Sequence, residues 1–346
     1  MKISYAKYSL TLRHQFTISY NSRSSTPVVL IRIEHEGFTG YGEASLPPYL
    51  HETQDSVIEF LRKAASVKSI DVTAYAKFLM YVDKISEGNT AAKASIDIAM
   101  HDLIGKIQNK PCYKFYQEEK RSLPFTSFTI GIDDPSVIKQ KIKEAEQFKI
   151  LKVKLGTNHD REFITLIREE TDKPIYADIN QGWNNKEEAL DNIYWLRQKN
   201  VLLIEQPFPK NDLDNSAWLT GRSPLPIIAD ESIQRLADIE KIKNSFTGIN
   251  IKLMKCTGVN EAFKMILRGR ELGLKIMLGC MTETSCAISA ALHLSSLVDY
   301  ADLDGNLLIT NDPFNAVTVS DGLLQLSDKP GLGVDLYNEL KFIDIY

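Results

Sequence analysis

The chain has 346 residues, of which 43% are hydrophobic and 25% charged. This composition is typical of a globular protein with a large core. The formal net charge of −4 argues against a nucleic-acid partner, because proteins that bind nucleic acid usually carry a basic face. No apolar run reaches the roughly 18 residues of a membrane-spanning helix, and the first residues show no signal-peptide pattern. We therefore expect a cytoplasmic protein without a membrane partner.

Cysteine and histidine spacing excludes further classes of protein. The four cysteines show no CxxC spacing and are expected to be reduced thiols. The six histidines follow neither an HxH nor an HExxH pattern, which argues against a zinc site.

Residues 1–120 are predicted to form an α+β domain. The segment Val28–Ile33 is rich in β-branched residues and ends just before Glu36-Gly37, which predicts two strands around a turn. Apolar residues recur at three- and four-residue spacing from Ile96 to Ile107. This spacing predicts a helix that stops before Asn109-Lys110-Pro111.

In residues 121–325, short apolar runs alternate with helical segments. This alternation predicts βα units and a parallel sheet. Eight units without a GxGxxG motif favour a closed barrel over an open Rossmann sheet. We expect the α/β class, with a TIM-type barrel of seven to eight βα units, and a segment 326–346 that returns to the first domain. The runs are SFTIGI, ILKVKL, PIYADIN, LLIEQP, IIADES, GINIKL, KIMLGC and YADLDG.

Carboxylates stand late in three successive runs, at Asp178, Glu205 and Asp230. The carboxyl ends of parallel strands meet on one face of a barrel, where such barrels perform chemistry, so these side chains are expected to converge. A few carboxylates with open positions for water or substrate suit Mg²⁺. An isolated salt bridge would explain any one of them, but three at matched positions favour a metal site.

Two lysines flank this triplet, since Lys154 comes one unit before it and Lys252 one unit after it. We expect them on opposite sides of the metal. Nearby cations lower the pKa of a lysine, which suits it to act as a base. Two bases on opposite sides of a carbon acid can remove a proton from one face and return it to the other, as in a racemase or epimerase. The cation would stabilise the enediolate of a carboxylate substrate.

The whole chain resembles the enolase superfamily, muconate-lactonizing subgroup. The matching motifs are ASIDIAMHDLIGKIQNKP, KVK, ADIN, IEQP, IADES, NIKLMK and YADLDG. The resemblance implies an N-terminal capping domain and a Mg²⁺ cofactor. It implies that the three carboxylates are the metal ligands and that the two flanking lysines are the paired acid and base.

The same resemblance implies roles for further residues. Lys152 would support the substrate carboxylate, and Thr129 would contact the substrate. Asn180 and Glu231 would lie beside the metal ligands.

The subgroup contains muconate cycloisomerases, o-succinylbenzoate synthases, N-acylamino acid racemases and dipeptide epimerases. Asp302 and Asp304 are two residues apart, so they share one face of the eighth strand and could hold an ammonium group. Only the dipeptide has a free N-terminal ammonium, and the pair resembles that of the dipeptide epimerases. We therefore predict an isomerase that inverts the α-carbon of the C-terminal residue of Ala-Xaa dipeptides, with a role in cell-wall peptide metabolism.

Substrate choice is expected to come from two loop segments of the capping domain, Gln15–Ser25 and Leu46–Thr53. In epimerases that act on Ala-Glu, an arginine in the first segment pairs with the glutamate side chain. The matching position here is Asn21, and Arg23 is close by. The sequence therefore predicts a small or apolar second residue, as in Ala-Ala or Ala-Val, with Ala-Glu as the alternative. The apolar side chains of the first segment that would line the pocket are Phe16, Ile18 and Tyr20.

Other functions remain open at this point. One is turnover of the other acids of the subgroup, which would use the same lysines and metal ligands. Another is a barrel that only binds a carboxylated metabolite, although binding alone does not require two bases. Family members often form symmetric oligomers, so a homo-oligomer is compatible with the resemblance.

Overall fold

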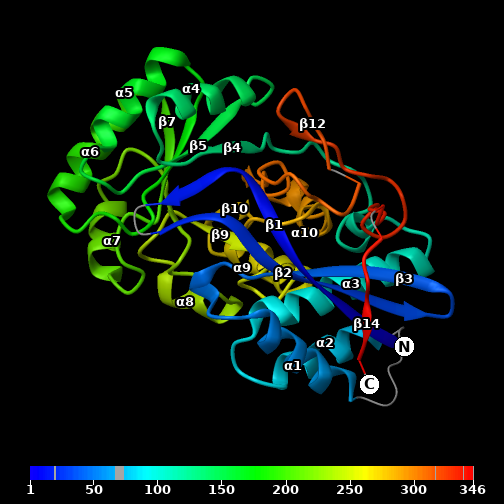
Figure 1. The fold of residues 1–346 in the computed structure, drawn as a ribbon. Helices are drawn as coiled ribbons and strands as arrows, with labels where there is room; N and C mark the ends of the chain where they lie inside the picture. Colours follow the sequence, from blue (N-terminus) through cyan, green and yellow to red (C-terminus); the bar gives the residue numbers. More distant parts are fainter. Residues whose placement is uncertain (19–20, 67–73, 316, 338, 346) are drawn as a thin grey trace.

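The first domain is built on a four-stranded sheet with the order β14-β1-β2-β3 (Figure 1). The computed structural model describes the chain except residues 19–20, 67–73, 316, 338 and 346, and the side chains of residues 16–21 are not described either. The strands are β1 (Lys2–Ile18), β2 (Asn21–His35), β3 (Phe38–Ser45) and β14 (Ile343–Asp344). Glu36 and Gly37 join β2 to β3 with positive φ angles, so the predicted turn is confirmed.

The pairing of β14 with β1 brings the last residues of the chain onto the sheet of the first domain. The domain bounds 1–120, 121–325 and 326–346 stay a prediction. The termini lie close together at one side of the molecule (Figure 1).

The last residues of β1 pair with the first residues of β2, and this hairpin reaches from the sheet across the barrel (Figure 1). After a register shift between Thr11 and Phe16, the strands pair again, with Phe16 opposite Arg23. The backbone amide of Arg13 donates to the carbonyl oxygen of Leu308 (2.9 Å), which connects the hairpin to the segment that follows the last barrel strand. The segment Gln15–Ser25 was expected to be a loop, but its described residues are largely paired strand, because the ladder resumes after the shift.

Among the described residues, α1 (Gln54–Ala65) and α3 (Thr90–Ile107) pack against the sheet, and α2 (Tyr75–Lys84) packs against α3. The long helix α3 packs against β3 with its backbone almost in contact, because a Cβ at Gly42 would lie 2.0 Å from the carbonyl oxygen of Ser95. The same holds at Gly40, whose Cβ would lie 2.2 Å from the carbonyl oxygen of Ala99. The glycines of the second predicted strand therefore allow the helix to approach the sheet.

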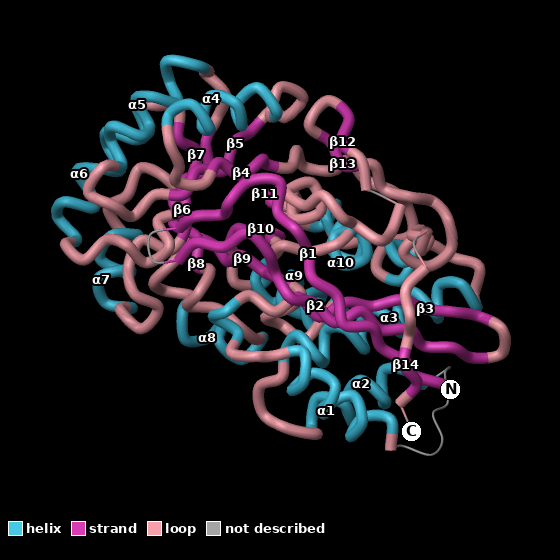
Figure 2. Tube along the Cα trace, viewed as in Figure 1, coloured by secondary structure: helices cyan, strands magenta, loops and turns pink. Residues whose placement is uncertain are grey.

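Eight parallel strands form the second domain, in unbroken order from β4 to β11. A parallel bridge between Thr126 and Ala301 joins the first strand to the last, so the predicted barrel is confirmed. Figure 2 shows helices outside the strands of the barrel. The strands are β4 (Ser127–Ile130), β5 (Ile150–Lys154), β6 (Ile175–Asp178), β7 (Val201–Glu205), β8 (Ile227–Ala229), β9 (Gly248–Lys252), β10 (Lys275–Gly279) and β11 (Tyr300–Asp302). The helices are α4 (Pro135–Glu144), α5 (Asp160–Glu170), α6 (Lys186–Gln198), α7 (Leu213–Thr220), α8 (Ile239–Ile242), α9 (Val259–Glu271) and α10 (Ser285–Leu292). A small hairpin of β12 (Val319–Ser320) and β13 (Leu323–Leu324) follows the barrel.

Polar contacts join the two domains on the side of α9. Asp97 of α3 accepts from the backbone amide of Val259 at the start of α9 (2.6 Å). Arg235 donates to both Asp83 of α2 and Glu261 of α9.

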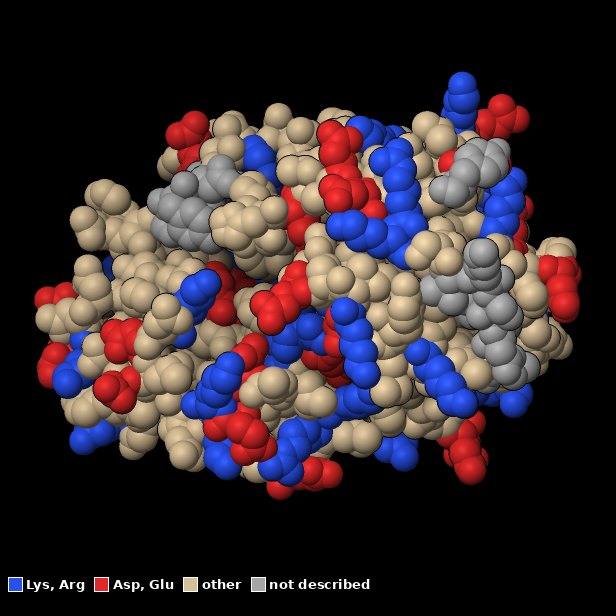
Figure 3. Space-filling model, turned by 90° about the horizontal axis from the view of Figure 1, so that it is seen from below, with Lys and Arg blue, Asp and Glu red and all other residues tan. Residues whose placement is uncertain are grey.

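On the face seen from below, basic and acidic side chains are interspersed (Figure 3). Within the described residues, every helix is too short or too polar to cross a membrane.

Candidate active site

The register of the barrel brings the predicted site residues to one end of successive strands. Lys154 is paired with Asp178 across β5 and β6, and Asp178 with Glu205 across β6 and β7. Lys252 ends β9, next to β8, and Asp230 follows the last residue of β8 directly. Strand ends in the same register place these side chains at one mouth of the barrel.

Asp178, Glu205 and Asp230 form a buried carboxylate triad, with one oxygen of each within 4.8 Å of the others. Two neighbouring oxygens, Oδ1 of Asn180 and Oε2 of Glu231, are buried without a hydrogen-bond partner among the described residues. A group of oxygen ligands beside unsatisfied oxygens fits a hard divalent cation such as Mg²⁺. The triad would hold the ion. The roles expected for Asn180 and Glu231 beside the metal ligands stay a prediction.

Lys152 is fully buried at the centre of this group. Its ammonium lies 2.8 Å from Glu205, 2.8 Å from Asp302 and 3.1 Å from Asp178. Burial opposes its charge, but these carboxylates raise the pKa of Lys152 well above its ordinary value. These contacts favour the charged form of Lys152, which suits it to a negative substrate group.

Lys154 and Lys252 contact opposite ends of the triad. The ammonium of Lys154 lies 2.6 Å from Asp178, and that of Lys252 lies 2.8 Å from Asp230. Burial would lower the pKa of Lys252, but Asp230 and then Tyr49 raise it well above its ordinary value. The sequence analysis expected a lowered pKa; in the structure the carboxylate partner outweighs burial and the neighbouring cation. A divalent cation on Asp230 would oppose that attraction and favour the neutral amine.

The acidic groups of the site differ in protonation. Although burial opposes it, Lys154 and Lys152 lower the pKa of Asp178 to about 2. Burial and the charge of Asp178 raise the pKa of Glu205 to about 7. Burial and Asp230 raise the pKa of Glu231 to about 8. Such crowding of buried carboxyl groups is typical of a functional site.

Asp302 and Asp304 line the same cavity as the lysines. Asp302 accepts from the Ser127 hydroxyl (2.6 Å) and pairs with Lys152, so its charge is already matched within the protein. Asp304 accepts from the backbone amide of Thr129 (2.7 Å). Burial and Asp302 raise the pKa of Asp304 to about 7. A bound ammonium group would therefore neutralise the charge of Asp304, whereas Lys152 already neutralises that of Asp302.

The wall of the cavity comes from both domains. Arg23 of β2 and Tyr49 from the segment Leu46–Thr53 contribute from the first domain, and Met281 and Leu308 from the second. Arg23 donates to the Thr282 hydroxyl (3.1 Å). Of the remaining predicted specificity residues, Tyr20 lies outside the described residues. The side chains of Phe16, Ile18 and Asn21 also lie outside what the structure describes.

Three residues that were not predicted from the sequence contact the triad and fix its position. Gln206 adopts a left-handed backbone (φ 39°) directly after Glu205, and its side-chain oxygen accepts from the backbone amide of Asp230 (2.9 Å). Asn250 donates to Oε1 of Glu205 (2.8 Å). Lys255 donates to Oδ1 of Asp230 (2.5 Å). The IEQP and NIKLMK motifs contain all three residues, but the motif letters alone do not show which atoms they contact.

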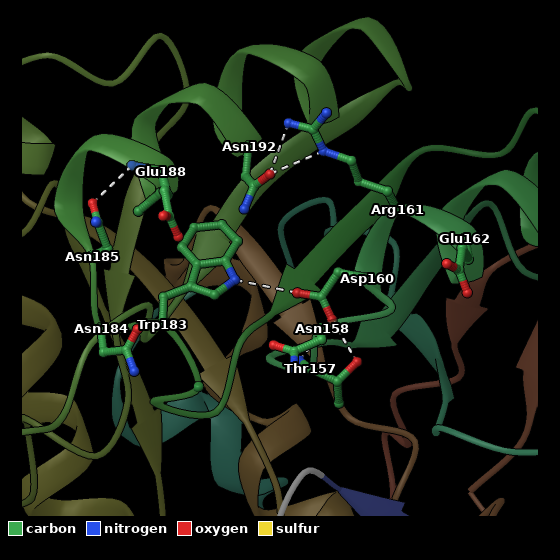
Figure 4. Close-up of a pocket in the computed structure, with 12 residues that line it drawn as sticks. Thr157, Asn158, Asp160, Arg161, Glu162, Trp183, Asn184, Asn185, Glu188 and Asn192 are labelled. Carbon is green, nitrogen blue, oxygen red and sulfur yellow. Dashed lines mark hydrogen bonds between the residues drawn. The ribbon is translucent and has the colours of Figure 1, made fainter.

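Trp183, which followed the ADIN motif, lies away from this cavity. Its indole nitrogen donates to Asp160 (3.2 Å) and joins the first residue of α5 to the loop after β6. Figure 4 shows it in a separate polar pocket between α5 and α6, with Arg161, Glu188 and Asn192. Trp183 is buried there, which is consistent with packing.

A barrel with a carboxylate triad between two lysines defines an enolase-type site for carbon acids. Residues 3–115 match the mandelate racemase/muconate lactonizing enzyme N-terminal domain, and residues 138–340 match the enolase C-terminal domain-like family. The chain therefore belongs to this family, and the resemblance found in the sequence is confirmed.

Several of its relatives are epimerases. An L-Ala-D/L-Glu epimerase of Bacteroides thetaiotaomicron is 55% identical over 96% of this chain and 88% of its own. An L-Ala-D/L-amino acid epimerase of Pedosphaera parvula is 37% identical over 95% of this chain and 97% of its own. A dipeptide epimerase of Cytophaga hutchinsonii, solved with Mg and D-Ala-L-Val, has a TM-score of 0.93 at 26% identity and covers 100% of this chain and 99% of its own. The prediction of an isomerase is confirmed by these relatives, and the prediction of magnesium agrees with them.

Proposed function

We propose that this protein is a Mg²⁺-dependent dipeptide epimerase, which inverts the α-carbon of the C-terminal residue of an alanyl dipeptide. One observation carries the proposal: a single cavity is lined by Lys154, Lys252, Asp302 and Asp304, beside the triad. Paired bases serve inversion at carbon, and the aspartates serve recognition of an ammonium group. The relatives that act on dipeptides support the same function.

Different residues of the site carry out different parts of the reaction. Bound Mg²⁺ supplies positive charge to stabilise the negative charge that develops on the substrate carboxylate. Lys152 adds a second positive charge there. One of Lys154 and Lys252, as the neutral amine, removes the α-proton, and the other, as the ammonium, donates a proton to the opposite face. The two lysines exchange roles in the reverse direction.

Asp304 is assigned to the substrate ammonium, and its substitution tests that assignment. We expect Asp304→Asn to raise KM for dipeptides by about 10- to 100-fold, since a charge-assisted hydrogen bond is worth about 1.5–3 kcal/mol. In the wild type kcat/KM should fall as the pH drops through about 7, because protonation removes the charge of Asp304. Steady-state kinetics against pH check both effects. An unchanged KM would contradict the role of Asp304. Turnover of o-succinylbenzoate, muconate or N-acylamino acids, which have no ammonium, with no effect of Asp304→Asn would favour those substrates.

The second residue of the dipeptide is where two predictions compete. The sequence analysis favoured a small or apolar residue. An acidic residue is favoured by Arg23, whose side chain lines the cavity, and by the 55% identical relative that acts on L-Ala-D/L-Glu. We propose glutamate, with Ala-Ala and Ala-Val as the alternatives. A role in cell-wall peptide metabolism and a homo-oligomeric state stay predictions.

Arg23→Met separates the two predictions, because methionine keeps much of the side-chain length and removes the charge. We expect kcat/KM for L-Ala-L-Glu to fall by about 10- to 100-fold, the usual effect of removing a charged hydrogen-bond donor. The value for L-Ala-L-Ala should stay nearly constant. Chiral chromatography of both dipeptides after incubation with Mg²⁺ measures the effect. Equal losses on both dipeptides, or faster turnover of L-Ala-L-Ala by the wild type, would contradict an acidic subsite.

A further inference from the structure

Two lysines contact the same metal-ligand carboxylate from different sides. Lys252 approaches Oδ2 of Asp230, and Lys255 approaches Oδ1. Lys252 lines the active-site cavity, whereas Lys255 lies behind the carboxylate and outside the cavity lining.

The ammonium of Lys255 is fully occupied by protein acceptors. It donates to Oδ1 of Asp230 (2.5 Å), to the carbonyl oxygen of Asp230 (2.7 Å) and to the carbonyl oxygen of Asn250 (3.1 Å). An ammonium has three hydrogens, so each has an acceptor. Lys255 is 1% exposed and therefore has no room to leave this position. Among the described residues, Lys252 has a single hydrogen-bond acceptor, which suits a group that must move a proton.

Lys255 contacts both the backbone carbonyl and the carboxylate of Asp230, and together these contacts fix the rotation of the carboxylate. Oδ1 of Asp230 is directed to Lys255, which leaves Oδ2 on the side of Lys252. The contact to Asn250 extends this restraint, because Asn250 donates to Oε1 of Glu205, a second member of the triad. Gly279 leaves room for the Asn250 side chain, since a Cβ there would lie 2.5 Å from Asn250 Oδ1.

We propose that Lys255 is a positioning residue for the metal site, which holds the Asp230 carboxylate in one orientation, with Oδ2 toward Lys252, in which it would ligate the ion. The inference rests on the proposed metal site and not on the identity of the dipeptide. Outer partners of a metal ligand typically contribute about 10- to 100-fold to metal affinity. The ammonium also repels a cation, so the proposal requires that orientation outweighs this repulsion.

The chain contains a matched control in Lys93. It is similarly buried, and it donates to Oδ1 of Asp83 (3.1 Å), to the carbonyl oxygen of Asp83 (2.9 Å) and to the carbonyl oxygen of Ser86 (2.7 Å). Lys93 therefore has the same kinds of acceptor as Lys255 but lies in the capping domain. Lys93→Met should cost stability in a similar way without affecting the metal.

The test is Mg²⁺ binding to purified protein by titration calorimetry, without substrate, on the wild type, Lys255→Met and Lys93→Met. We expect Lys255→Met to weaken Mg²⁺ binding by about 10- to 100-fold and Lys93→Met to leave it unchanged. Unchanged or tighter binding by Lys255→Met would overturn the proposal. If that variant does not fold, Lys255→Gln, which keeps a neutral donor, should bind Mg²⁺ more weakly than the wild type, and equal binding would overturn the proposal. A wild type that binds no Mg²⁺ would instead overturn the proposed function.

Discussion

Lys252→Ala should lose epimerisation by about 10²- to 10⁴-fold, the usual contribution of a positioned acid or base. Lys154→Ala should show a loss of the same order, because inversion requires both faces of the α-carbon. Each variant keeps one base, so each should still exchange the α-proton of one diastereomer with solvent, and the two variants should act on opposite diastereomers. Proton NMR in deuterated water follows the loss of the α-proton signal for each diastereomer separately.

Lys93→Met again provides a control, since it removes a buried ammonium from the capping domain, where no reacting group is placed. It should retain epimerisation in both directions. Full activity of both Lys154→Ala and Lys252→Ala would contradict the two-base mechanism. Exchange of the same diastereomer by both variants would contradict the placement of the lysines on opposite faces.

Glu205→Gln should have the second large effect, on the metal. The substitution keeps the size of the side chain and removes a charge that is buried in the triad. Since loss of an outer partner costs about 10- to 100-fold in metal affinity, loss of a ligand charge should cost more than about 100-fold. Epimerisation should fall with metal occupancy and recover in part at high Mg²⁺ concentration. Calorimetric titration with Mg²⁺ and rate measurements against Mg²⁺ concentration give the two quantities.

Asp302→Asn is the matched control for that experiment. Asp302 and Glu205 lie at the same distance from Lys152, 2.8 Å, but only Glu205 belongs to the triad. If the effect of Glu205→Gln came only from the lost ion pair with Lys152, both variants would bind Mg²⁺ equally weakly. We expect Asp302→Asn to bind Mg²⁺ with an affinity close to that of the wild type.

The barrel and the triad were predictable because both follow from short-range periodicity. Each strand is a short apolar run, and one carboxylate stands at the same point of each of three successive units, as at Asp178. Parallel register then converts equal position along the strand into closeness in space, so the contact between Lys154 and Asp178 follows from sequence spacing. The capping helix up to Ile107 was predictable for the same reason.

The restraints around the triad were not predictable, because they depend on loop geometry. Gln206 reaches the amide of Asp230 from a left-handed residue, and no periodic pattern predicts that conformation. Lys255 contacts two backbone carbonyl oxygens. Every residue has such an oxygen, so the sequence does not show which of them a lysine contacts. The raised pKa of Lys252 likewise depends on the balance between burial and Asp230, which only distances decide. The hairpin near Arg23 depends on strand pairing that resumes after a register shift.

The most direct test of the account is α-proton exchange in deuterated water with Mg²⁺, for L-Ala-L-Glu, L-Ala-L-Ala and L-Ala-L-Val, read by mass spectrometry. The account predicts a gain of one deuteron at the α-carbon of the C-terminal residue, fastest for L-Ala-L-Glu. A chelator should abolish the gain, and so should the double substitution of Lys154 and Lys252 by alanine. Protein that binds Mg²⁺ yet leaves every alanyl dipeptide without deuterium would contradict the central claim.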